Sequence, residues 1–227
     1  MSTSIAPPSL LHDTLQRGVA AFRQNVTGMA IIVILGLLIL GSYATLPQVR
    51  SSLDQLAAWK TNVGWIFPTC SMALVAGLIP VALRFAITRQ TPPWRCVAVI
   101  GLYWPYRGVE IDLLYRGLGT LIGNDAAVGT VALKVVIDMS LYVPFWALPL
   151  YLLVTAWQQG ESPLALVREA RFWRERYLPG VLTNWLLWIP AVAIIYALPP
   201  GLQLPVQNLF MVIWIFIVEV IASRERS

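Results

Sequence analysis

Four ionisable residues with mirrored spacing lie in a long apolar part of the chain, on either side of a short turn near Asp125: Asp112 and Arg116 before it, Lys134 and Asp138 after it. Each aspartate is four residues from its cation, so each pair shares one helix face. If the turn closes an antiparallel helical hairpin, the aspartates lie at one depth and the cations roughly 6 Å away, at 1.5 Å rise per residue. Such a net-neutral cluster would be a structural latch if it is dry, or would line a cavity or pore if it is wet.

Five further residues are candidates for the same site: Arg107, Glu110, Tyr115, Asn184 and Trp188. Arg107 and Glu110 are one turn apart and can pair with each other or with another helix. Asn184 and Trp188 share a helix face, and Asn184 either hydrogen-bonds a neighbouring helix or contacts a cavity.

Glycines recur on the helix face that carries Asp112, at Gly101, Gly108, Gly119 and Gly123. Glycine lets a neighbouring helix approach closely. This face should therefore be turned into a helix bundle, and Asp112 with it.

The residues that most enzymes need are scarce. The one histidine, His12, lies outside the apolar segments, and Cys70 and Cys96 are isolated from each other. No glycine-rich phosphate loop is present, and the sequences around the two aspartates lack the motifs of intramembrane aspartyl proteases. We therefore expect a protein that is not an enzyme and that carries no metal or cofactor.

The composition indicates a membrane protein. Of the 227 residues, 58% are hydrophobic and 12% are charged, against roughly 25% charged residues in soluble domains. Segments long enough to cross about 30 Å of hydrocarbon as helices predict an all-α, polytopic helical membrane protein with about six transmembrane helices. The segments are Met29–Leu46, Gly64–Ile87, Cys96–Gly123, Ala127–Trp157, Gly180–Leu198 and Leu202–Ala222. The last two, separated by Pro199–Gly201, could instead form one re-entrant element.

The distribution of charge predicts an orientation. With six crossings, eleven of the 16 Lys and Arg residues fall on the side of the two termini, and only Arg50 and Lys60 fall on the other. Positively charged loops stay on the side from which the chain is inserted, so both termini should be cytoplasmic. The basic balance is then a topology signal, and no nucleic-acid partner is expected.

The regions around the six segments are assigned by pattern. Residues 1–28 resemble a cytoplasmic amphipathic lead, for which a transit peptide is the alternative, and 29–46 form an extra N-terminal transmembrane helix. Residues 53–223 form the main helical membrane domain, and 224–227 are a basic tail. The arginine-rich loop Gln158–Pro179 should be an amphipathic helix at the lipid headgroups, or a surface that docks a partner.

The string YLPGVLTNWLLWIP, which contains Asn184, Trp188 and Pro190, resembles the signature of the Mpv-seventeen and peroxisomal membrane protein (twenty-two kilodalton) family. The chain departs from the family pattern where Leu83-Arg84 replace glycine–aspartate, and where Asp112 stands in place of a histidine. Further spacings agree with the family: Pro68 nine before Gly77, Gly108 seven before Tyr115, Lys134 and Asp138 before Pro144, Pro200 twelve after Trp188, and Trp214 near the end.

The resemblance implies a distant, bacterial member of a family of channel-like proteins. Such proteins are associated with passive passage of small solutes and with membrane homeostasis. The expected partners are the lipid bilayer and small solutes, and homo-oligomerisation is left open. We expect the bacterial cytoplasmic membrane, with the mitochondrial inner or peroxisomal membrane as the alternative. The competing function is that of a non-transporting structural or lipid-organising membrane protein.

Overall fold

The computed structural model describes the backbone of residues 10–224 and the side chains of residues 26–216. In this part of the chain all regular secondary structure is helical, with turns and short connections between the helices. The described chain forms eight continuous helices, because π-helical stretches join several of the helical elements end to end. The elements are α1 (Leu10–Thr45), α2 (Pro47–Val63), α3 (Ile66–Met72), α4 (Ile79–Thr88), α5 (Trp94–Ala98), α6 (Trp104–Ile122), α7 (Val128–Ile137), α8 (Leu148–Gln158), α9 (Pro163–Leu166), α10 (Ala170–Phe172), α11 (Leu178–Ala197) and α12 (Pro200–Arg224).

Each of the four π-helical stretches ends two residues before a proline. Proline lacks an N–H group and its ring clashes with the carbonyl of the preceding turn, so that turn widens. The stretches, each with its proline, are Ala73–Leu78 (Pro80), Val99–Tyr103 (Pro105), Asp138–Ala147 (Pro149) and Trp173–Tyr177 (Pro179). The helices therefore remain continuous but are locally rewound.

Among the residues that the structure describes, four helices are long and apolar enough to cross a membrane: Val26–Thr45, Ile66–Thr88, Val128–Gln158 and Ala170–Ala197. The other two expected segments are helical as well. The helix over 94–122 carries five charged residues, and the described apolar part of α12 is the shorter Pro200–Phe216. The all-helical class is thus confirmed, and four of the predicted segments are long apolar helices that could span a membrane.

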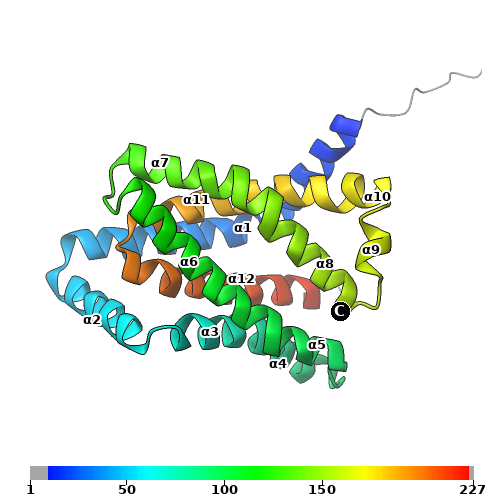
Figure 1. Cartoon of the computed structure of the whole chain (residues 1–227), viewed down its shortest axis with the longest axis horizontal. Helices are drawn as coiled ribbons and strands as arrows, with labels where there is room; N and C mark the ends of the chain where they lie inside the picture. The colour runs from blue at the N-terminus through cyan, green and yellow to red at the C-terminus, as the bar shows by residue number, and fades with distance from the viewer. Residues whose placement is uncertain (1–9, 225–227) are drawn as a thin grey trace, which may run out of the picture.

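The long helices run back and forth between two ends of the bundle (Figure 1). The start of α1, the connections at 89–93 and 159–162 and the end of α12 lie at one end. The turns at 123–127 and 198–199 lie at the other, where α2 also packs. α11 and α12 are two separate helices that reverse direction at Leu198–Pro199.

α12 occupies the interior of the bundle and contacts α1, α2, α6 and α11. Leu202, Leu204 and Phe210 of α12 are fully buried, as is Ile195 of α11. α3 packs closely on α6 at Gly108, where a Cβ atom would overlap the Pro68 carbonyl group. One glycine of the predicted face is therefore a point of helix contact, whereas Gly101 has open space beside it.

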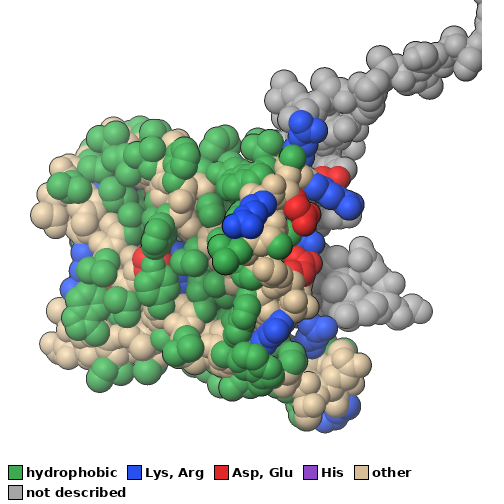
Figure 2. All heavy atoms as spheres, turned by 45° about the vertical axis from the view of Figure 1, so that its right-hand side comes forward, with side chains coloured by type: hydrophobic (Ala, Val, Ile, Leu, Met, Phe, Trp, Pro, Cys, Tyr) green, Lys and Arg blue, Asp and Glu red, His purple; other side chains and the backbone are tan. Residues whose placement is uncertain are grey.

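The outer surface of the bundle is largely apolar. Leu121, Leu102 and Phe145 are 83%, 75% and 74% exposed. Hydrophobic side chains cover much of the face in Figure 2, and most Lys and Arg side chains stand toward one end. Water-soluble monomers rarely expose large contiguous apolar patches, so this surface suits a hydrocarbon environment.

Two expected boundaries differ from the structure. α1 is one continuous helix from Leu10, so no break separates residues 10–28 from the first predicted segment. The side chains that predict an amphipathic lead lie outside the described residues, as does the tail at 225–227. Residues 47–63, which lie between the first two predicted segments, form α2. This helix begins with Pro47, at a position where the missing N–H group costs nothing.

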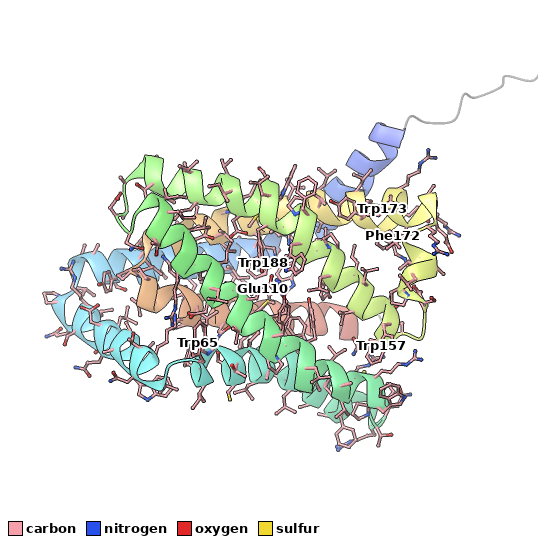
Figure 3. All side chains as sticks on the ribbon, viewed as in Figure 1. Trp65, Glu110, Trp157, Phe172, Trp173 and Trp188 are labelled. Atoms are coloured by element: carbon pink, nitrogen blue, oxygen red, sulfur yellow. The ribbon has the colours of Figure 1, made fainter. Side chains whose placement is uncertain are left out.

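The arginine-rich region after Gln158 also differs. In place of one amphipathic helix over this region, the structure has the short α9 and then a long helix that already begins at Ala170. Arg176 donates two hydrogen bonds to Glu161, at 2.6 and 3.0 Å, which lower the pKa of this carboxyl group. Figure 3 shows Trp157, Phe172 and Trp173 at the same end of the bundle, as expected for aromatic side chains at a membrane interface.

The expected turn between the two charged helices is confirmed. Asp125 lies between α6 and α7, and its Oδ1 atom accepts the backbone N–H of Ala127 at 3.0 Å. Hydrogen bonds from the Thr130 side chain and from this N–H hold the pKa of Asp125 below its usual value. The turn thus starts α7 and sets the two helices antiparallel (Figure 1).

Candidate functional site

Asp112 lies at the centre of a buried ion cluster. Its Oδ1 atom is 2.6 Å from Nζ of Lys60 on α2, and its Oδ2 atom is 2.7 Å from Nε of Arg116. Asp112 and Lys60 are buried, whereas the Arg116 side chain is half-exposed and its guanidinium group lies 5.1 Å from the ring centroid of Trp65. The expected pairing of Asp112 with Arg116 is formed, and Lys60 is a second cation that the sequence did not suggest.

Lys134 and Asp138 were expected to pair with each other, but they do not. Lys134 is fully buried, but none of the described residues forms a hydrogen bond or ion pair with its Nζ atom. This atom lies 5.7 Å from the ring centroid of Tyr196 on α11. The Tyr196 hydroxyl group donates to Oδ2 of Asp138 at 2.8 Å. The single four-residue cluster is therefore absent among the described residues, because α2 and α11 supply partners from outside the hairpin.

Arg107 and Glu110 form an ion pair at 2.7 Å. Nη1 of Arg107 also donates to the Tyr142 hydroxyl group at 2.7 Å, and the guanidinium group lies over the Tyr142 ring. Both expected modes of pairing, within the helix and across helices, are thus present.

Tyr115 connects α6 with α11 and α12. Its hydroxyl group donates to Oε1 of Gln207, and its ring packs edge-on against Tyr196 with centroids 5.2 Å apart. Because Tyr196 in turn donates to Asp138, these four residues form a path of two hydrogen bonds and one aromatic contact across the bundle interior.

A cavity of about 450 Å³ lies beside this path. Residues of α3, α4, α6, α8, α11 and α12 and of their π-helical stretches line it. Asn184 lies on its wall, and Oδ1 of Asn184 is buried with no hydrogen-bond partner among the described residues. Figure 3 places Trp188 and Glu110 near the middle of the bundle. The polar and aromatic lining residues are Arg107, Asp138, Asn184, Gln207, Tyr103, Trp104, Tyr115, Tyr142, Tyr151, Trp188 and Trp214.

The structure divides the predicted site residues into two groups. Five of them line the cavity: Arg107, Tyr115, Asp138, Asn184 and Trp188. The other four lie outside its wall: Asp112, Arg116, Lys134 and Glu110.

Four residues that bind the predicted site residues were not predicted from the sequence: Lys60, Tyr142, Tyr196 and Gln207. Lys60 had a signal, because helical spacing places it on the face that carries Leu53 and Ala57, which pack against the core. Tyr142, Tyr196 and Gln207 had none, since no local pattern marks an interior tyrosine or glutamine as a partner of a distant side chain.

Within the part of the chain whose side chains are described, no group of three or more His, Cys, Asp or Glu side chains could hold a metal ion. The side chains on the cavity wall offer hydrogen bonding, ion pairing and aromatic contact. Comparison of the chain with protein-family models, with curated proteins and with solved structures gives no match.

Proposed function

We propose that this chain is an integral membrane protein that allows small polar solutes to pass through its helix bundle. The observation that carries the proposal is the cavity of about 450 Å³, which has Arg107 and Asp138 on its wall inside a bundle with an apolar surface. Ionisable groups at membrane depth are costly, and they usually mark a pathway or a binding site. The cavity size falls within the range of small-molecule sites, about 300–1,000 Å³.

The proposed topology has six crossings, formed by the four long apolar helices, the helix over 94–122 and α12. The charges of α6 are compatible with a crossing, because Arg107 and Glu110 pair with each other and Asp112 is fully enclosed. Both termini would then be cytoplasmic, and the most fitting location is a bacterial cytoplasmic membrane.

The resemblance to the Mpv-seventeen and peroxisomal membrane protein family supports passive passage as the mode of transport. Of the residues that carry the resemblance, Asn184 and Trp188 lie on the cavity wall. We therefore propose distant membership of this family and a role in membrane homeostasis.

A non-transporting structural role is the second candidate. It is favoured by the cluster of Lys60, Asp112 and Arg116, which joins α2 to α6 without lining the cavity. In that case the charges of the hairpin would serve only to fix helix pairing.

Solute flux in liposomes tests the proposal. Purified protein should accelerate the swelling of vesicles placed in an isotonic solution of a small polar solute. Ala147 is buried and lines the cavity, so Ala147→Trp should fill the space and reduce the protein-dependent rate by about 10-fold, the loss that about 1.4 kcal/mol in a barrier produces.

The matched control is Ala132→Trp, the same change at an exposed position of α7, which should leave the rate unchanged. Gel filtration establishes that both variants fold. A rate equal to that of protein-free vesicles would refute passage and favour the structural role. Equal effects of the two tryptophans would show that the cavity is not the route.

A further inference from the structure

The cavity wall carries two hydrogen-bond acceptors with free capacity. Oδ2 of Asp138 accepts the Tyr196 hydroxyl group, but Oδ1 receives no hydrogen bond from the described residues. Oδ1 of Asn184 is buried and also lacks a donor among them. Unmet buried acceptors are costly, so a ligand that fits this wall should bring N–H or O–H donors.

The charges on the wall favour a cation as the ligand. Asp138 is the one carboxylate among the described lining residues, and it forms no ion pair with any described cation. The wall's cation, Arg107, is already matched by Glu110 at 2.7 Å. Lys134, one turn from Asp138, lies outside the wall and against the Tyr196 ring.

The two cations that contact Asp112 are already engaged. Lys60 and Arg116 both pair with Asp112, at 2.6 and 2.7 Å. Asp138 is therefore a buried carboxylate (4% exposed) whose counter-charge a ligand can supply.

The rest of the wall suits a cation with an apolar body. Aromatic faces attract ammonium groups and also pack against hydrocarbon. Tyr115, Tyr142, Tyr151, Trp188 and Trp214 surround the same cavity, which at about 450 Å³ accommodates a molecule the size of a phenylalkylamine.

We propose that the cavity binds a protonated primary amine with a small apolar or aromatic body. The ammonium group donates hydrogen bonds to Asp138 and Asn184, and the body packs against the aromatic wall. This inference rests on the proposed function, for which it names the class of solute.

Equilibrium binding of radiolabelled phenethylammonium to the purified full chain in lipid nanodiscs tests the proposal, with empty nanodiscs as the blank for partition into lipid. Unlabelled 2-phenylethanol and 3-phenylpropionate are competitors of similar size that are neutral and anionic. The amine should bind at least about 10-fold more tightly than the alcohol, since a hydrogen bond to a charged group contributes about 1.5–3 kcal/mol. The carboxylate should not compete.

Asp138→Asn should weaken amine binding by about 10-fold or more, because it removes the charge and keeps the shape. Asp54→Asn, the same change on the exposed surface of α2, should leave binding unchanged. If gel filtration shows that Asp138→Asn misfolds, Trp188→Leu replaces it, and weaker amine binding is again expected.

Equal affinity for amine and alcohol, or preference for the carboxylate, overturns the inference even if solutes cross the liposome membrane. Conversely, selective amine binding without solute flux overturns passage and leaves the amine site standing. The two failures are therefore separable.

Discussion

At the scale of single residues, Asp112, Lys60 and Arg116 should contribute unequally to the free energy of unfolding, because they differ in burial and in the partners they keep when one of them is changed. Removing one partner of a buried ion pair costs about 3–5 kcal/mol when the other is left uncompensated. Asp112→Asn leaves Lys60, which is only 4% exposed, without its partner. Lys60→Met leaves Asp112 still paired with Arg116. We therefore expect Asp112→Asn to be clearly more destabilising than Lys60→Met.

The measurement is chemical unfolding of the protein in detergent. Combining Lys60→Met with Asp112→Asn should recover much of the stability that Asp112→Asn loses, because no buried charge is then unpaired. Arg116→Gln is the control and should cost less than Asp112→Asn, because Asp112 then keeps the buried Lys60 as its partner. Equal losses for the Lys60 and Asp112 variants would contradict the arrangement of this cluster.

At the scale of helices, the contact of α3 with α6 depends on the absence of a side chain at Gly108. A methyl group there would overlap the Pro68 carbonyl group, so Gly108→Ala should force the helices apart and cost about 1–3 kcal/mol. Gly117, on the same helix, has nothing within 4 Å of an added Cβ atom. Gly117→Ala should therefore be neutral or stabilising, by up to about 1 kcal/mol. Thermal unfolding of both variants measures the difference, and similar effects would show that α3 and α6 are not in close contact.

The π-helical stretches are a second feature at this scale. Three of the four contribute to the cavity wall, with Ala76, Tyr103 and Asp138 among the lining residues. A π-helical turn changes the direction of the side chains that follow it, and such turns are frequent at functional sites. The prolines thus help to shape the cavity through the turns that precede them.

At the scale of the whole molecule, the six-crossing topology places the two ends of the bundle on opposite sides of the membrane. This topology rests on the alternating direction of the helices and on the charge asymmetry. In a variant without native cysteines (Cys70→Ala, Cys96→Ser), Ala126→Cys should react with an impermeant maleimide added outside intact cells. Gln90→Cys should react only after the cells are lysed. Both positions are exposed and lie in connections at opposite ends of the bundle (Figure 1). Labelling of both from one side would disprove the six-crossing topology.

Features that depend on neighbouring residues can be predicted from the amino-acid sequence alone. Apolar runs of bilayer length predicted the long helices to within a few residues, apart from α1, which already begins at Leu10, and the helix that begins at Ala170. The reason is that backbone hydrogen bonds within each segment are met only in a helix. The pairs Arg107–Glu110 and Asp112–Arg116 were accessible because they are three and four residues apart on one helix.

The distant side chains that complete the site are set by how the helices pack against one another. Tyr196 and Asp138 are separated by 58 positions, and Tyr115 and Gln207 by 92. Helical periodicity says which residues share a face, but not which helix that face meets or how the two are rotated. Asp138 therefore joins Tyr196 instead of Lys134, and Asp112 gains Lys60. The cavity likewise exists only because six helical elements pack around it, and no single segment carries its shape.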